Sequence, residues 1–274
     1  MRDLPKNRIF NVDCVVGMRD SPDCCVALTV TSPPYDRLRK YGGHEFPFEQ
    51  IATELYRITM VGGVLVWVVA EQIIDGSESG TSSEQRLYFR DLGFRSHQTL
   101  VLHGLGSGHQ YHNRYGGPLQ YAFVLSRGKP RYINLIRDRV NKSRGRERPF
   151  SKRAADGQIV RGSRLYKTGT WGARGPIWDF PTGRSISEED FASAHPARMA
   201  ESIARDHIIS WSKPGDLVFD PMCGSGTTCK QALLNHRRYL GMEIHTPYFE
   251  IAMRRMALAH ERYAEQLAQE LRSQ

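Results

Sequence analysis

The chain has 274 residues, of which 40% are hydrophobic, and this suits one large α/β domain or a core domain with a smaller insert. Thirty-eight Lys and Arg against 29 Asp and Glu give a net charge of +9. No apolar run reaches the roughly 18 residues of a membrane span, and the N-terminus lacks the apolar core of a secretory signal. The five cysteines are odd in number and form no CxxC pair, which argues against a disulfide scaffold or structural zinc and favours a reducing cytoplasm.

Strands and helices alternate along the chain. Apolar or alternating runs predict strands at 8–12, 26–30, 64–69, 96–102, 119–125, 217–220 and 239–243. Helical spacing predicts helices at 48–60, 83–92, 198–210, 227–235 and 247–271, the first of them ended by Gly62-Gly63. The tandem Pro33-Pro34 cannot continue a strand or sit inside a helix, so it predicts a rigid turn. This alternation predicts an open, mostly parallel α/β sheet.

Positive charge is concentrated between Arg127 and Ile186, where 16 Lys or Arg accompany only four acids. That segment carries +12, so the rest of the chain carries −3. It is rich in glycine, and the tyrosines and tryptophans Tyr132, Tyr166, Trp171 and Trp178 lie among its charges. Basic side chains suit phosphate contacts and aromatic ones suit stacking on bases, so the segment predicts a nucleic-acid surface. On charge alone, the alternative is a solvated loop without a partner.

A glycine turn lies between the strand at 217–220 and the next helix, in the stretch DPMCGSGTT. Gly224 and Gly226 let backbone approach a ligand, and the helix N-terminus offers free N–H groups. The spacing fits neither a Walker A loop nor the GxGxxG pattern. Glu243 ends the following strand, 23 residues after Asp220, where an acid can accept both ribose hydroxyls of a nucleoside. The alternative is a tight turn followed by a surface glutamate.

Three motifs in one order resemble the β group of DNA amino-methyltransferases, the N6-adenine/N4-cytosine family. Thr31-Ser32-Pro33-Pro34-Tyr35 resembles their catalytic motif, Phe219 to Thr228 resembles their S-adenosylmethionine motif, and His195 to Asp216 resembles the segment before it. The resemblance covers nearly all of the chain except the basic segment, which falls in the target-recognition slot. It implies a Rossmann-like methyltransferase sheet with a circularly permuted motif order. The implied catalytic domain spans 1–126 and 190–274, and the target-recognition region spans 127–189.

The same resemblance implies S-adenosyl-L-methionine as the cofactor. The residues that it assigns to cofactor binding are Asp13, Thr31, His195, Asp220, Pro221, Met222, Gly224, Ser225, Gly226, Thr227, Thr228, Glu243 and Ile244. For Asp13 the alternative is a helix N-cap, and for His195 it is a plain role in helix entry.

The catalytic motif suits attack by an exocyclic amine, whose lone pair is delocalised into the base. The Ser32 side chain and the Pro33 carbonyl can accept its two N–H bonds and aim the lone pair at the sulfonium methyl. Pro34 keeps these acceptors rigid, and Tyr35 can stack on a base flipped from the duplex. No metal is required. Methylation of cytosine C5 needs a Pro-Cys nucleophile, which the chain lacks, so Cys223 and Cys229 are predicted to be packing residues.

We expect double-stranded DNA as the substrate. The residues predicted to contact it are Arg37, Arg39 and Lys40 after the catalytic turn, and Arg144, Arg146, Arg164, Lys167, Trp171 and Arg174 in the basic segment. A solvated loop is the alternative for the first group. His103, His109 and His112 have no carboxylate or cysteine to complete a site, so no metal is expected.

Alternatives to this function stay open. A catalytically dead DNA-binding regulator is favoured only by the basic segment, and a related turn can serve an RNA or protein-glutamine methyltransferase. Adenine N6 is the preferred target, because the turn followed by Tyr41-Gly42-Gly43 resembles solitary and phage-type adenine enzymes; Ser32 keeps cytosine N4 open. The resemblance implies a homodimer through the sheet domain, and the apolar residues of 247–271 either add contact surface or cover the sheet. A restriction endonuclease would be a separate chain, and a solitary regulatory enzyme is equally compatible.

Overall fold

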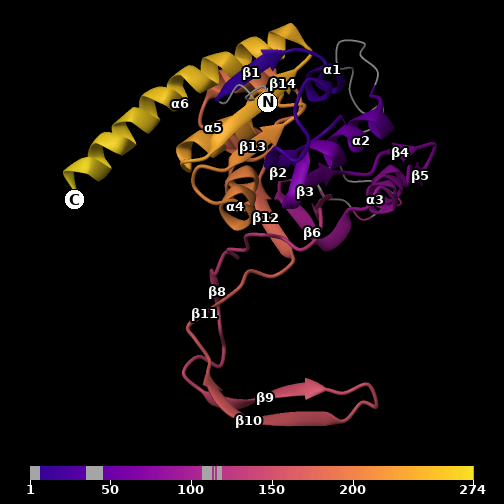
Figure 1. The fold of residues 1–274 in the computed structure, drawn as a ribbon, viewed down its shortest axis with the longest axis vertical. Coiled ribbons are helices and arrows are strands. Elements are labelled where there is room, and N and C mark those ends of the chain that lie inside the picture. The colour runs from indigo at the N-terminus through magenta and orange to yellow at the C-terminus, as the bar shows by residue number, and fades with distance from the viewer. Residues whose placement is uncertain (1–6, 35–45, 107–112, 114, 116–118, 274) are drawn as a thin grey trace. The chain divides into compact units, whose positions relative to one another are not determined.

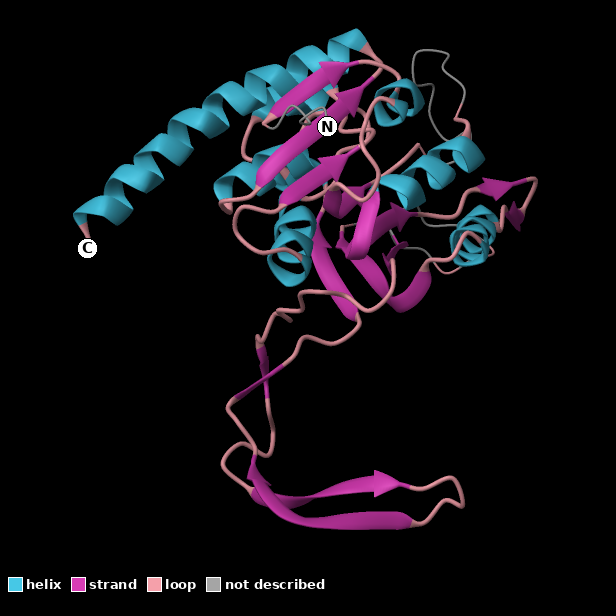
Figure 2. Ribbon diagram, viewed as in Figure 1, coloured by secondary structure: helices cyan, strands magenta, loops and turns pink. Residues whose placement is uncertain are grey.

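Eight strands form the sheet on which the larger part of the chain is built (Figures 1 and 2). The computed structural model describes residues 7–34, 46–106, 113, 115 and 119–273. The strand order is β1-β14-β13-β2-β3-β7-β6-β12. Neighbouring strands are parallel except where β7 pairs antiparallel with β3 and β6, so the mostly parallel sheet is confirmed. The strands are β1 (Arg8–Asn11), β2 (Val26–Thr31), β3 (Thr59–Val69), β6 (Arg95–Leu105), β7 (Leu119–Ser126), β12 (Ile177–Pro181), β13 (Leu217–Asp220) and β14 (Arg238–Glu243).

Helices cover both faces of this sheet. One face packs against α1 (Cys14–Arg19), α2 (Phe48–Ile58) and α3 (Thr81–Asp91), and the other against α4 (Glu201–Trp211), α5 (Thr227–Leu234) and α6 (Thr246–Arg272). Two one-turn 3₁₀ segments, η1 (Gly183–Ile186) and η2 (Asp190–Ala194), precede α4. No helix in the described ranges is long and apolar enough to cross a membrane.

Strand β3 shows why the central strands are continuous apolar runs. Val64, Val66 and Val68 belong to the hydrophobic cluster beneath α4, α5 and α6. The alternate residues Leu65, Trp67 and Val69 belong to the cluster beneath the other helices. Successive side chains of a strand point to opposite faces, so a strand covered on both sides needs apolar residues at every position.

The boundary between α2 and β3 differs from the sequence-based expectation. The helix ends at Ile58 and the strand begins at Thr59, so Gly62 and Gly63 lie inside the strand and do not end the helix. Gly62 has φ +78°, and its N–H donates to the Arg127 carbonyl at 2.6 Å. The pairing of β2 with β3 is interrupted on this side, so the glycines form an irregularity at the entry of the strand.

Strand β12 corrects the prediction for Trp178. This strand pairs with β6 in parallel, and Trp178 is 7% exposed, with its ring stacked at 4.8 Å on buried His207. Trp178 is therefore a core residue and cannot stack on bases. Its strand was missed because it is short and follows a long basic stretch.

A second unit comprises Leu135–Gly175. Its strands are β8 (Arg139–Val140), β9 (Glu147–Arg153), β10 (Ile159–Lys167) and β11 (Trp171–Gly172), and they pair as β8 with β11 and β9 with β10, both antiparallel. The unit is narrower than the expected region 127–189, because the flanking residues on both sides belong to the larger unit. The larger unit also carries a small ribbon of β4 (Ile73–Ile74) and β5 (Ser77–Glu78).

Candidate active site

The carboxyl ends of β1, β14, β13 and β2 meet at one edge of the sheet because these strands are parallel. From β13 the chain continues through α5 to β14 on one side, and from β2 it continues through α2 to β3 on the other. The connections diverge between β13 and β2, which makes this position a topological switch point. Open α/β sheets bind ligands in the crevice outside such a point. The two predicted motifs follow these two strands.

A hydrogen bond joins the two motifs directly. The Thr31 hydroxyl donates to Asp220 Oδ1 at 2.7 Å, from the end of β2 to the end of β13. The Thr228 hydroxyl donates to the Val30 carbonyl at 3.0 Å, so the first turn of α5 is also tied to β2. Ser32 and Pro33 follow Thr31 in the chain, so the predicted catalytic turn begins beside the glycine loop.

The backbone of the glycine loop packs closely against its neighbours. Gly224 and Gly226 have φ +51° and +78°, which disfavours residues with a side chain. A Cβ at Gly224 would lie 2.7 Å from His195 Nε2, and one at Gly226 would lie 3.1 Å from the Ala252 Cβ. Both glycines are therefore needed for the loop to fit between β13 and α6.

Glu243 stands at the end of β14 and holds this loop from the other side. It is 7% exposed, and its carboxylate accepts from the Gly224 N–H at 2.8 Å and from the His245 N–H at 2.9 Å. Each carboxylate oxygen has two acceptor positions, so a carboxylate can accept from hydroxyl groups as well as from backbone N–H groups. An acid at this strand end, with a glycine loop beside it, fits the ribose of S-adenosylmethionine. A cofactor role for Glu243 stays a prediction.

Two residues with an open alternative have defined contacts in the structure. Asp13 is the N-cap of α1, since its Oδ1 accepts from the Val15 and Val16 N–H groups at 2.8 and 3.0 Å. His195 Nδ1 accepts from the Ala197 N–H at 3.2 Å, and its ring lies 4.3 Å from the Tyr248 ring. These contacts match the alternative roles in capping and helix entry, and the proposed cofactor contacts stay predictions.

The remaining predicted cofactor residues lie along the same edge. Pro221 is buried, Met222 is half-buried, and Ile244 is 38% exposed after β14. Ser225 and Thr227 are buried and contact the side chain of Arg255. Burial of Ser225 and Thr227 indicates that these two side chains support the loop from behind.

The cysteines next to the loop are packing residues, as predicted. Cys223 and Cys229 are 6% and 1% exposed, and a Cβ at Gly241 would lie 2.8 Å from Cys229 Sγ. The hydrogen bond with Cys229, followed by burial, raises the pKa of Cys223 well above its ordinary value. A protonated thiol is a poor nucleophile, which agrees with an amine as the methyl acceptor.

Several predicted residues lie outside the described part of the chain. They are Tyr35 of the catalytic motif, the DNA contacts Arg37, Arg39 and Lys40, the loop Tyr41-Gly42-Gly43, and the histidines His109 and His112. Of that histidine group, His103 is described, and its Nδ1 lies 2.9 Å from Asp179. Within the described ranges, no three His, Cys, Asp or Glu side chains gather as they would around a metal ion.

The predicted DNA contacts of the basic segment belong to the smaller unit. Arg144, Arg146, Arg164 and Lys167 are exposed, and Trp171 is 53% exposed. Arg174 is partly buried, and its guanidinium donates to Asp138 Oδ2 from both Nε (2.7 Å) and Nη2 (2.5 Å). Arg174 therefore links the residue just before β8 to the segment just after β11, and a DNA contact from it stays a prediction.

Sequence reasoning missed three residues near the glycine loop, which are two buried cations and a tyrosine. Arg255 of α6 and Lys230 of α5 are 0% and 1% exposed, and both are ion-paired behind the glycine loop. Tyr248 lies with its ring 4.3 Å from both His195 and His245. A charged residue in an amphipathic helix is usually on the surface, so the sequence carried no signal for the two buried cations.

Asp220 is a buried carboxylate with a perturbed pKa. Burial raises the pKa of Asp220 from 3.8 to about 6, and hydrogen bonds from Thr31, Thr228 and the Met222 N–H offset this only in part. Because the folded state binds this proton more tightly than the unfolded state, ionisation of Asp220 between about pH 4 and pH 6 reduces stability.

We predict that Asp220→Asn raises the free energy of unfolding at pH 7 by roughly 1–3 kcal/mol, because the amide oxygen still accepts from Thr31 without a buried charge. Urea unfolding of both proteins should show that the difference in their free energies of unfolding is about 1 kcal/mol smaller at pH 5 than at pH 7. Asp91→Asn, at an exposed position, is the control. An equal difference in unfolding free energy at both pH values would contradict the raised pKa of Asp220.

Comparisons with known proteins agree with this geometry. A family model described as DNA methylase (N6_N4_Mtase) matches residues 26–254. The chain is 46% identical to the orphan methyltransferase M.BamHII of Bacillus amyloliquefaciens over 85% of this chain and 89% of that relative. A shorter stretch, 34% of this chain and 31% of the relative, is 37% identical to the DNA adenine methyltransferase YhdJ of Escherichia coli K12.

The fold is shared with solved methyltransferase structures. The PvuII DNA methyltransferase, which is cytosine-N4-specific, matches with a TM-score of 0.65 and 15% identity over 93% of this chain and 90% of that chain. The expected S-adenosylmethionine-dependent methyltransferase fold is thus confirmed. By its motifs, its fold and its match to M.BamHII, the chain belongs to the N6-adenine/N4-cytosine family of DNA amino-methyltransferases, whose methyl donor is S-adenosylmethionine.

Proposed function

We propose that this chain methylates the exocyclic amine of a base flipped out of double-stranded DNA, with adenine N6 as the acceptor. The observation that carries the proposal is the Thr31–Asp220 hydrogen bond, which joins the strand leading into Ser32-Pro33-Pro34 to the loop carrying Gly224. When bound, S-adenosylmethionine supplies a methyl group on a sulfonium centre, which an amine lone pair can attack.

The residues after Thr31 prepare the amine for attack. The Ser32 hydroxyl and the Pro33 carbonyl accept the two N–H bonds, which draws the nitrogen out of conjugation with the ring. Ser32 is half-buried and Pro33 is buried, so these acceptors act with little competition from water. Tyr35 stacks on the flipped base, and the two prolines limit the freedom of the turn.

Adenine N6 and cytosine N4 are each supported by different observations. Adenine N6 is supported by the turn with its following Tyr41-Gly42-Gly43 and by the stretch shared with YhdJ, which is named as an adenine enzyme. Cytosine N4 is the second candidate, favoured by Ser32 at the first motif position and by the shared fold of the cytosine-N4-specific PvuII enzyme. The two bases present the same N–C–N edge, so one pair of acceptors can hold either amine.

Incubation with labelled S-adenosylmethionine and unmethylated DNA, followed by mass spectrometry of the nucleosides, tests both the methyl transfer and the choice of base. We expect N6-methyladenine, and we expect Ser32→Ala to lower kcat by about 10²–10³-fold, because one transition-state acceptor is lost. Ser273→Ala, near the C-terminus, should keep full activity. N4-methylcytosine alone would overturn the base assignment, and no methylated nucleoside would favour the catalytically dead regulator.

We further propose that the smaller unit, Leu135–Gly175, chooses the DNA site. It holds twelve Lys or Arg and three acids, a net +9 that equals the charge of the whole chain. Its longest element is the β9–β10 ribbon, and a two-stranded antiparallel ribbon fits the major groove of B-DNA. Charge and shape therefore both fit duplex DNA.

The register of the ribbon separates two faces. Arg148 pairs with Tyr166, Lys152 pairs with Val160, and Phe150 lies between the two basic residues on the same face. Phe150 is 62% exposed, Val160 59% and Tyr166 50%, so apolar side chains alternate with positive ones in contact with solvent. Such a face offers contacts to thymine methyl groups and to phosphates together.

Replacing residues 142–169 by Asn-Gly should keep cofactor binding and abolish site choice. The splice is compatible with the structure, because the Asn141 N–H donates to the Thr170 carbonyl at 2.9 Å and Val140 pairs with Trp171. Sequencing of modified positions in genomic DNA measures site choice, and calorimetry measures cofactor binding. Unchanged site choice would contradict the assignment.

A homodimer is proposed on family grounds and on the exposed side of α6. Leu258, Leu267 and Leu271 are 40%, 38% and 75% exposed, whereas Met256 is buried in the core. The second half of α6 extends past the sheet (Figure 1), which leaves these residues available for contact. The name of M.BamHII describes an orphan enzyme, which supports a solitary methyltransferase without a restriction partner.

Light scattering at tens of micromolar should give the mass of two chains, and Leu267→Glu/Leu271→Glu should reduce it to one by placing charge in the interface. The exposed Leu105→Glu on β6 is the control and should stay dimeric. A monomeric wild-type protein would refute the dimer.

A further inference from the structure

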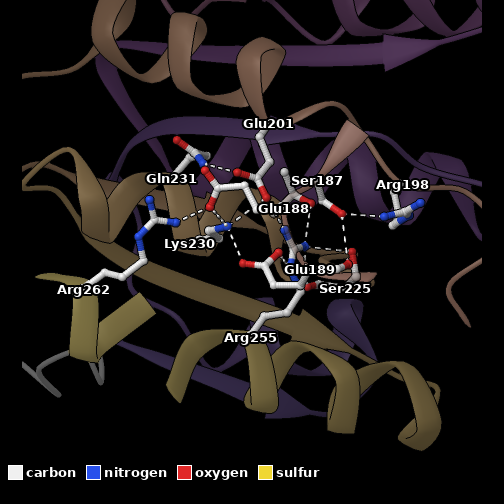
Figure 3. A network of polar contacts seen from close by, with 11 residues as sticks. Ser187, Glu188, Glu189, Arg198, Glu201, Ser225, Lys230, Gln231, Arg255 and Arg262 are labelled. Carbon is white, nitrogen blue, oxygen red and sulfur yellow. Dashed lines mark hydrogen bonds and ion pairs between the residues drawn. The ribbon is translucent and has the colours of Figure 1, made fainter. Parts of the chain in front are cut away.

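Two positive side chains are buried behind the cofactor loop, where charge is costly unless it is paired. Arg255 of α6 is 0% exposed and Lys230 of α5 is 1% exposed. Figure 3 shows both beside carboxylates, those of Glu188 and Glu189 after η1 and that of Glu201 at the start of α4. Glu189 and Glu201 each contact both cations, which closes a four-membered ionic network.

Arg255 reaches beyond this network to the loop itself. Its Nη1 donates to the Ser225 carbonyl at 2.9 Å, to the Ser225 hydroxyl at 3.1 Å and to the Thr227 hydroxyl at 2.9 Å. These two residues flank Gly226, which has φ +78° and caps α5. One guanidinium thus holds both sides of the turn.

The carboxylates orient the guanidinium. Arg255 Nε donates to Glu189 Oε2 at 3.0 Å, and Nη2 donates to Glu201 Oε1 at 2.6 Å. Burial acts to raise the pKa of Glu189, but Lys230 and Arg255 outweigh it and lower that pKa below its ordinary value. Glu189 is therefore held as an anion, and Arg255 has a fixed counter-charge on the side away from the loop.

We infer that Arg255 is a positioning residue for S-adenosylmethionine binding, held by Glu189 and Glu201 so that it keeps the backbone of Ser225 to Thr227 in the conformation that receives the cofactor. The inference rests on the proposed cofactor role of this loop. A general stabilising role would follow from the ion pairs alone. The three bonds to the loop, which span the left-handed Gly226, indicate a more specific one.

Lysine cannot replace arginine in this role. The guanidinium carries five N–H donors in a fixed plane, and Arg255 uses them in three directions. The ammonium of Arg255→Lys keeps the charge but offers one nitrogen, which cannot serve the loop and both carboxylates. This variant removes the positioning and leaves the buried charge paired.

Calorimetry of wild type and Arg255→Lys with S-adenosylmethionine tests the inference. We expect the variant to bind about tenfold or more weakly and to exchange the amide hydrogens of residues 224–228 faster without ligand. Its KM for the cofactor should rise, and its kcat at saturation should stay within about twofold of wild type. Arg262→Lys is the matched control, since Arg262 also lies on α6 and pairs with Glu188, which is 59% exposed.

The outcomes separate this inference from the proposed function. Glu189→Gln keeps the side-chain volume and should also weaken binding, which provides a second variant if Arg255→Lys does not fold. Wild-type affinity in both variants, or an equal loss in Arg262→Lys, would overturn the inference. Glu243→Gln tests the cofactor site itself, and wild-type affinity in that variant would overturn the proposed site.

Discussion

The hydrogen bond from the Thr31 hydroxyl to the Asp220 carboxylate joins two segments that lie 189 residues apart. It forms where the parallel strands β2 and β13 end side by side and the chain turns away from each in opposite directions. A crevice at such a point is a consequence of connectivity, because no connection crosses it. The predicted catalytic turn and the predicted cofactor loop share an edge for this reason, although one motif precedes the smaller unit and the other follows it.

In the predicted cofactor loop, the glycines allow unusual backbone conformations and charged side chains hold that backbone in place. Gly224 and Gly226 have left-handed conformations, which other residues adopt only at a cost. The same glycines would leave an isolated loop flexible. Glu243 holds it at the Gly224 N–H, and Arg255 holds it at Ser225 and Thr227. Charged groups therefore fix the backbone of the loop, which suits a site that must bind without reorganisation.

The positively charged side chains of the two units differ in burial and in pairing. In the larger unit Lys230 and Arg255 are buried and neutralised by Glu189 and Glu201. In the smaller unit twelve basic residues accompany three acids and lie mostly in contact with solvent. A buried charge is tolerated only when it is paired, and an excess of exposed positive charge attracts a polyanion. Under the proposed function, the larger unit holds the methyl-transfer site and the smaller unit contacts DNA, so the two kinds of positive charge belong to two units.

The sequence by itself determined the main features of the catalytic domain. The runs at 26–30, 64–69 and 217–220 predicted their strands because a strand covered on both faces must be apolar throughout. The motifs at Thr31 and Asp220 each followed a predicted strand, but only the strand order of the sheet placed β2 beside β13 and so brought the two motifs together. Tertiary structure alone decided that Trp178 lies in the core and that Arg255 and Lys230 are buried. A tryptophan among basic residues and a cation in a polar helix look exposed in the sequence. Trp178 is buried because its strand pairs with β6, and Arg255 and Lys230 are buried because Glu189 and Glu201 pair with them. These partners lie far away in the sequence, so no local pattern predicts them.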